Sequence, residues 1–122
     1  VARLQPGTTE EALAKEAGKL RRAPVVIAAV VVPGEDPVQA REDRDAVAAA
    51  VQNLLIAAHA RGLGGMWRTG AMADEPEVRE ALGLTGREAI VAFVYLGRRR
   101  GPGDGRGPAR RPAADVTTWR GW

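Results

Sequence analysis

The sequence predicts an α+β domain on the basis of three observations. Residues 25–32 and 88–96 are apolar runs rich in β-branched side chains, which is typical of strands covered on both faces. Between them, residues 43–61 carry apolar side chains at helical spacing. The chain has 122 residues, of which 45% are apolar, so it has room for one domain with a modest core.

The first predicted element is a helix over residues 9–22. Thr8 and Glu11 form a capping-box pattern at its start, because the threonine hydroxyl can accept from the amide three residues on while the glutamate reaches back. Pro24 ends this helix, and the apolar strand over residues 25–32 follows. Residues 33–37 are rich in proline and glycine and predict a turn.

The longest predicted helix covers residues 43–61. Its apolar stripe consists of Val47, Val51, Leu54 and Ala58. Alanines lie beside this stripe, so the helix is apolar on nearly all sides, and we expect it to be buried in the domain or in a dimer interface. Gln52 and Asn53 are polar residues on the same helix, and we interpret them as structural or interfacial because buried polar groups need partners.

Glycines and a short apolar pair follow this helix. Gly62 is expected to close it in a left-handed conformation. Gly64 and Gly65 allow close approach of backbone or of a flat ligand, and residues 66–67 predict a short buried strand. Residues 68–70 form a polar turn whose backbone N–H groups are free to donate.

A third helix is predicted from the start signal at residues 74–77, with Asp74 as the cap, and it stops at Gly83. Composition changes after the last strand. From residue 98 onward the chain has seven arginines against two aspartates, whereas residues 1–97 have eleven basic and thirteen acidic residues. We therefore divide the chain into a domain over residues 1–97 and an Arg/Gly/Pro-rich tail over residues 98–122, partly docked through Val116 and Trp119.

The residue inventory excludes several classes of enzyme. The chain has no cysteine, no serine and a single histidine, His59, so a nucleophilic triad and a clustered metal site are both excluded. We interpret His59 as a structural residue that interacts with the end of its helix. The acidic residues lie at helix starts, and no side chain is predicted to be catalytic. If the protein is an enzyme, its chemistry belongs to a cofactor.

Several motifs together resemble the FMN-dependent nitroreductase family, in particular its small members. They are Gln52-Asn53-Leu54-Leu55, Ala57-Ala58-His59, Gly62-Leu63-Gly64, Trp67-Arg68-Thr69-Gly70, Val78-Arg79, Ala81-Leu82-Gly83-Leu84 and Val94-Tyr95-Leu96-Gly97. The likeness covers about residues 20–119. Similar proteins carry a further N-terminal segment with an Arg/Ser-rich motif for the FMN phosphate, and residues 1–20 do not match it. We therefore expect residues 1–97 to be the C-terminal part of a nitroreductase-like domain.

The resemblance implies a central, mostly antiparallel sheet flanked by helices, with the long helix at a homodimer interface. It also implies FMN as cofactor and a ping-pong cycle in which NAD(P)H reduces the flavin and a nitro compound, a quinone or a similar acceptor is then reduced. The residues that it assigns to cofactor binding are Trp67, Arg68, Thr69, Gly70, Arg110 and Arg111. The last two match the family's basic C-terminal pattern, and arginine binds phosphate oxygens bidentately.

Other partners are less well supported. The longest apolar run, residues 24–33, is too short to span a bilayer, so we expect a cytoplasmic protein without a membrane partner. The alternative function is a non-catalytic module that binds nucleic acid through the tail arginines, Trp119 and Trp122. The domain itself is not basic, so we do not expect nucleic acid as a partner. The physiological acceptor, the choice between NADH and NADPH and the role of residues 98–100 stay open.

Overall fold

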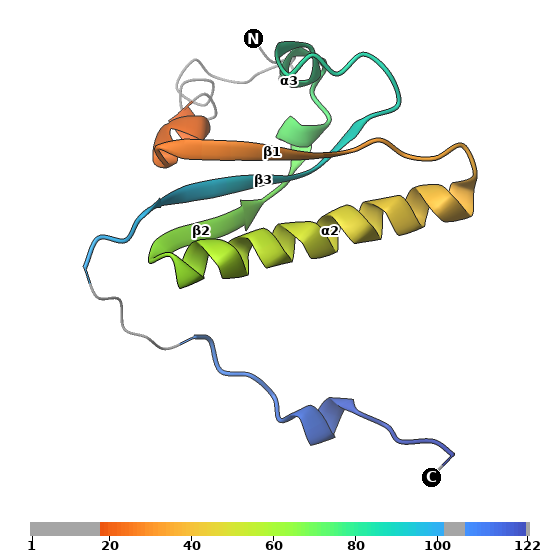
Figure 1. Cartoon of the computed structure of the whole chain (residues 1–122), viewed down its shortest axis with the longest axis vertical. Helices are drawn as coiled ribbons and strands as arrows, with labels where there is room; N and C mark the ends of the chain where they lie inside the picture. Colours follow the sequence, from red (N-terminus) through yellow and green to blue (C-terminus); the bar gives the residue numbers. More distant parts are fainter. Residues whose placement is uncertain (1–17, 102–106, 122) are drawn as a thin grey trace, which may run out of the picture.

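The computed structural model describes residues 18–101 and 107–121 and has the α+β architecture that the sequence predicts (Figure 1). Its elements are the 3-10 helix η1 (Gly18–Arg22), strand β1 (Val25–Val31), helix α2 (Pro37–Ala60), strand β2 (Leu63–Arg68), the 3-10 helix η2 (Ala71–Ala73), helix α3 (Pro76–Ala81), strand β3 (Ala89–Arg98) and the 3-10 helix η3 (Ala113–Val116). The helix predicted over residues 9–22 lies mostly outside the described residues, and its last part is η1. No helix in the described part is long and apolar enough to cross a membrane.

The three strands form one antiparallel sheet in the order β1-β3-β2. The expected antiparallel arrangement is thus confirmed, with β3 in the centre. The ladder between β1 and β3 contains an irregularity, because Ala29 lies opposite Ala92 whereas Val30 lies opposite Ile90. Val91 therefore has no partner on β1 and forms a bulge. Such an insertion bends the strand and changes the direction of its polar groups.

Helix α2 begins at Pro37, six residues before the predicted start at residue 43. The turn predicted over residues 33–37 was therefore wrong in its last residue, which belongs to the helix. The Asp36 carboxylate accepts hydrogen bonds from the N–H groups of Val38 and Gln39 at 2.9 and 3.0 Å. This is an N-cap, and Pro37 occupies the first turn, where its missing N–H removes no helical hydrogen bond. Asp36 and Pro37 thus start the helix, although their composition predicted a turn.

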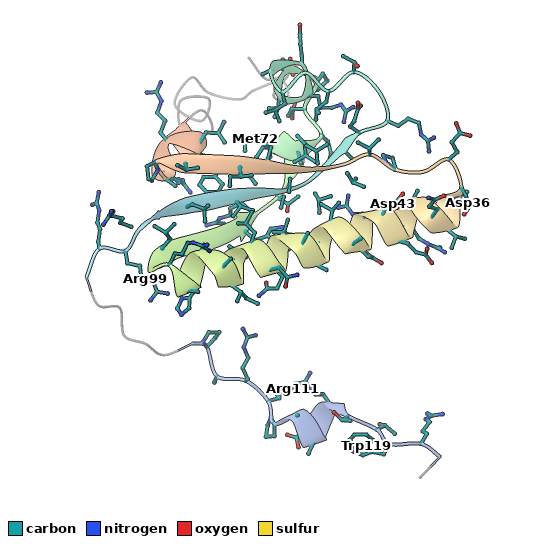
Figure 2. All side chains as sticks on the ribbon, viewed as in Figure 1. Asp36, Asp43, Met72, Arg99, Arg111 and Trp119 are labelled. Carbon is teal, nitrogen blue, oxygen red and sulfur yellow. The ribbon has the colours of Figure 1, made fainter. Side chains whose placement is uncertain are left out.

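The core lies on both faces of β3. On one face, α2 packs across the sheet through Val51, which clusters with Ala92 and Val94 and is joined by Leu54 and Leu55. On the opposite face, Ala73 of η2 clusters with Ile90 and Phe93; Met72, labelled in Figure 2, packs against this second cluster. The central strand is therefore the one covered on both sides, as the apolar run over residues 88–96 predicts.

Burial of the other elements is lower than the sequence predicts. Among the described residues, only one side of α2 is covered, since Ile56 is 57% exposed and Gln52 and Asn53 are exposed as well. Strand β1 was expected to be covered on both faces, but Val25 is 51% exposed and Ile27 is 36% exposed. One long helix and two short elements do not supply enough side chains to cover both neighbours of β3.

Two predicted helix boundaries depend on glycine, and both are confirmed. Gly62 follows α2 with φ 75° and Gly83 follows α3 with φ 70°, the left-handed conformation that ends helices. The predicted cap of the third helix was wrong. Glu75 holds the N-cap position of α3 without a side-chain hydrogen bond, while Asp74 ends η2.

The tail leaves β3 at Arg98 and runs away from the sheet and α2 (Figure 1). It contains η3, in which Thr117 donates a hydrogen bond to the carbonyl of Ala113 at 2.7 Å. Val116 is 57% exposed and Trp119 is 80% exposed, so the expected docking of these two side chains is not seen within one chain.

Candidate functional site

The candidate site is the turn at the end of β2, formed by residues 67–70. The indole N–H of Trp67 donates to the hydroxyl oxygen of Thr69 at 3.0 Å. The Thr69 hydroxyl in turn donates to the carbonyl of Val91 at 3.3 Å. Val91 is the bulged residue of β3, so two side chains of the turn connect it to the one irregular position in the neighbouring strand.

Gly70 gives the turn its direction. Its backbone angles are φ 118° and ψ −173°, a combination found essentially only in glycine. Its carbonyl accepts from the N–H of Ala73 at 2.9 Å, whereas its own N–H has no hydrogen-bond partner in the described part of the chain. A Cβ added at this glycine would meet no described atom within 4 Å beyond its chain neighbours. Within the described residues, the turn thus presents an amide donor that has no partner.

The side of the turn that follows Gly70 is anchored in the core. Ala73 is 4% exposed and clusters with Ile90 and Phe93. Asp74 continues the anchoring through a 3.0 Å hydrogen bond from its N–H to the carbonyl of Ala71. The turn is consequently held on both sides, by the Trp67–Thr69–Val91 hydrogen bonds before Gly70 and by η2 after it.

Arg68 lies in the same segment with its charge exposed. Its Nε donates to the sulfur of Met66 at 3.2 Å, a weak acceptor. Met66 itself is 51% exposed and Trp67 is 36% exposed, so the prediction that residues 66–67 form a buried strand was right about the strand and wrong about burial. The guanidinium keeps most of its donors available for a ligand.

The two glycines of β2 have different roles. A Cβ at Gly65 would lie 2.7 Å from Cδ2 of Leu55 and 3.3 Å from Cδ2 of Leu96, so this glycine lets α2 approach the sheet. A Cβ at Gly64 would lie 3.4 Å from Cγ of Arg99, an ordinary contact. At Gly65 close packing therefore explains the glycine, and a flat ligand is not needed to account for it.

The remaining predicted site residues lie elsewhere. Arg110 and Arg111 belong to the tail, which lies on the far side of α2 from the sheet (Figure 2), so a single chain does not bring them to the turn. Arg99, from the arginine run without a predicted role, donates to Nδ1 of His59 at 3.1 Å. The expected partners of His59 were the last carbonyls or the dipole of its helix; the structure instead pairs its ring with the first part of the tail.

Two features of the structure were not predicted from the sequence. Val91 is one of eight consecutive apolar residues in β3, Ala89 to Leu96, and nothing in that run indicates which residue bulges. A shallow apolar groove of about 200 Å³ also lies at the opposite end of the sheet from the turn, lined by Pro24, Val25, Leu63, Leu96, Gly97 and Arg98. Only the register of the three strands brings these residues together, so no local pattern predicts the groove.

Comparisons with known proteins identify the family. A model described as the nitroreductase family matches residues 2–98. A protein named as an NAD(P)H nitroreductase, YdjA of Escherichia coli strain K12, is 38% identical over 92 residues, which are 75% of this chain and 50% of that protein.

Solved structures give the same result. A nitroreductase-like family protein from Bacillus cereus aligns with a TM-score of 0.76 at 30% identity, covering 93% of this chain and 62% of that one. A nitroreductase from Desulfovibrio desulfuricans, solved in complex with FMN, aligns with a TM-score of 0.51 at 24% identity, covering 98% and 89%, and supports the fold alone. The chain spans about half the length of the curated relatives it matches. It belongs to the nitroreductase family.

Proposed function

We propose that the protein is an FMN-dependent NAD(P)H oxidoreductase in which the turn at residues 67–70 faces the edge of the flavin ring. The free N–H of Gly70 carries the proposal. A donor held in place before a ring gains negative charge stabilises that charge without reorganisation. Gly70 meets this requirement because its backbone is anchored on both sides and its N–H has no partner in the described part of the chain.

The residues present fit a flavin in part. The amide of Gly70 would donate to the ring, the guanidinium of Arg68 would supply a cation nearby, and Arg110 and Arg111 would bind the phosphate. When bound, FMN would take a hydride from NAD(P)H and pass the electrons to a nitro compound, a quinone or a similar acceptor. The protein would work in the cytoplasm, as the family likeness suggests.

The proposal includes a homodimer with the flavin between subunits, because one chain leaves the tail arginines apart from the turn. The uncovered side of α2 supports this arrangement. It carries Ile56, which is 57% exposed, together with exposed alanines of the kind that let two helices approach closely: Ala46, Ala49, Ala50, Ala57 and Ala60. A second copy packed along this side would bury the surface that the sequence predicts to be buried.

The test begins with the absorbance spectrum of the protein purified at its native length. We expect a yellow protein whose flavin band is bleached by NADH or NADPH without an acceptor and returns when a quinone or a nitro compound is added. A protein that takes up no flavin from excess FMN, or whose flavin neither nucleotide reduces, would refute the proposal. A colourless protein that binds nucleic acid with strong salt dependence would favour the alternative module instead.

A second measurement tests the phosphate assignment. The double variant Arg110→Ala/Arg111→Ala should bind FMN more weakly than the unmodified protein but should bind riboflavin equally well, since riboflavin lacks the phosphate. The matched control is Arg120→Ala, which removes a tail charge outside the matching motif. Equal losses for FMN and riboflavin would contradict a phosphate role.

A further inference from the structure

Trp67 supplies the first hydrogen bond of the anchor that precedes Gly70, and the proposed function gives its indole no role toward the flavin. Its indole N–H donates to the Thr69 hydroxyl at 3.0 Å, and that hydroxyl donates to the carbonyl of Val91 at 3.3 Å. We propose that Trp67 is a positioning residue, which fixes the turn so that the Gly70 amide is aimed before any ligand binds. The part of this inference that concerns the flavin rests on the proposed function.

The conformational freedom of Gly70 supplies the physical reason. Glycine adopts φ 118° and ψ −173° without strain but populates many other conformations as readily, so contacts of the neighbouring residues must fix the turn. On the far side, η2 does this through the buried Ala73. On the near side, the β2–β3 ladder runs as far as Arg68, and beyond it the hydrogen bond from Thr69 to Val91 connects the turn to β3.

The indole N–H, the threonine hydroxyl and the Val91 carbonyl can form a continuous chain of hydrogen bonds. A threonine hydroxyl can accept one hydrogen bond while it donates another, and donation into the hydroxyl polarises it toward stronger donation. The indole N–H is a donor only, so it can stand only at the start of the chain. The Val91 carbonyl, at the bulge, stands at its end.

The position of the tryptophan on β2 explains why the residue is large. Trp67 lies opposite Val94 of β3, and Val94 is fully buried. Residues paired across an antiparallel ladder share a face, so the ring lies beside the core while its N–H reaches the turn. A phenylalanine would keep the apolar contact and remove only the donor.

The experiment compares Trp67→Phe and Thr69→Val, each of which removes one polar group while nearly keeping shape. Trp119→Phe is the matched control because Trp119 lies on the tail and is 80% exposed. The first readout needs no flavin. It is the hydrogen exchange rate of the Ala73 amide, which donates to the Gly70 carbonyl and so reports on the turn.

We expect exchange at Ala73 to be about threefold to tenfold faster in Trp67→Phe and in Thr69→Val, the factor that one lost hydrogen bond brings. Trp119→Phe should match the unmodified protein. Thr69→Ser keeps the hydroxyl and should restore slow exchange. The double variant Trp67→Phe/Thr69→Val should be no faster than the faster single variant, because both changes break the same chain of bonds.

The second readout is the reduction potential of bound FMN in the flavin-loaded protein. It should become more negative in Trp67→Phe and Thr69→Val, because a mobile amide stabilises the reduced ring less well. Unchanged exchange at Ala73 would overturn the inference, and so would faster exchange with an unchanged potential. A protein that never binds FMN refutes the proposed function instead, and the exchange rates then decide by themselves whether Trp67 positions the turn.

Discussion

Replacing Gly70 with alanine tests whether the turn after β2 requires a glycine. Its angles, φ 118° and ψ −173°, lie in a region where any other residue is strained by about 1–3 kcal/mol. An alanine Cβ there would meet no described atom within 4 Å beyond the chain neighbours, so crowding adds nothing to this strain. We therefore expect Gly70→Ala to lower the free energy of unfolding by about 1–3 kcal/mol.

Urea unfolding followed by circular dichroism measures the change, with two glycine controls. Gly107→Ala also places its Cβ in open space, but its φ lies outside the left-handed region, so its effect should stay within about 0.5 kcal/mol. Gly83→Ala forces a left-handed alanine at φ 70° and should cost about 1–2 kcal/mol. A Gly70→Ala protein as stable as Gly107→Ala would refute the strain argument.

Four further outcomes are expected. Leu54→Ala should cost about 2 kcal/mol in urea unfolding, the low end for a core leucine because this one is half-buried, and should weaken self-association in sedimentation velocity. Hydrogen bonds from its own N–H and from the N–H of Gly86 lower the pKa of Glu88, so the stability that its carboxylate contributes is lost as pH falls below 4.5 and through that lowered pKa. Glu88→Gln cannot titrate and should therefore show a smaller fall in Tm over this pH range. Thr69→Ala keeps the backbone amide and should retain the flavin colour, whereas Gly70→Val should lose it; absorbance spectra with the reverse ranking would place the site elsewhere. Titration should show that these 122 residues alone bind FMN weakly, because residues 1–20 do not match the family's phosphate-binding motif, and a sub-micromolar Kd would contradict this expectation.

The sequence predicted the elements well because each one has a local signature. An apolar, β-branched run suffices for β1 and for β3, and the stripe through Val51 and Leu54 suffices for α2. Glycines with positive φ at residues 62 and 83 end their helices where expected. These features depend on neighbours in the chain, which a single sequence displays directly.

Helix boundaries and caps were predicted less well, because the same few residues are compatible with more than one local structure. Pro37 is compatible both with a turn and with the first turn of a helix, and the choice depends on whether the Asp36 carboxylate accepts the exposed amides. At α3, Asp74 has the right side chain for a cap and yet ends η2, so the cap position passes to Glu75. Such choices are decided by three-dimensional geometry over one or two residues.

The candidate site was predictable only in part. The composition of residues 68–70 indicates a polar turn with free amides, and the family resemblance singles out residues 67–70. The contact from Thr69 to Val91 joins residues 22 positions apart, and it depends on a bulge within an unbroken apolar run. A register irregularity of this kind leaves no mark in composition or periodicity, so only the folded structure reveals the partner.

Trp67 shows why an error in predicted burial can point toward function. An apolar pair at the end of a short strand predicts a buried tryptophan, whereas its ring is 36% exposed and its N–H is used within the turn. An exposed indole N–H can donate to water. Here it donates to Thr69 instead, because the turn holds the hydroxyl oxygen 3.0 Å away. The same turn contains Gly70, whose conformation is open only to glycine and whose amide has no partner in the described part of the chain. An exposed aromatic residue hydrogen-bonded within such a turn is better explained by positioning of that amide than by packing.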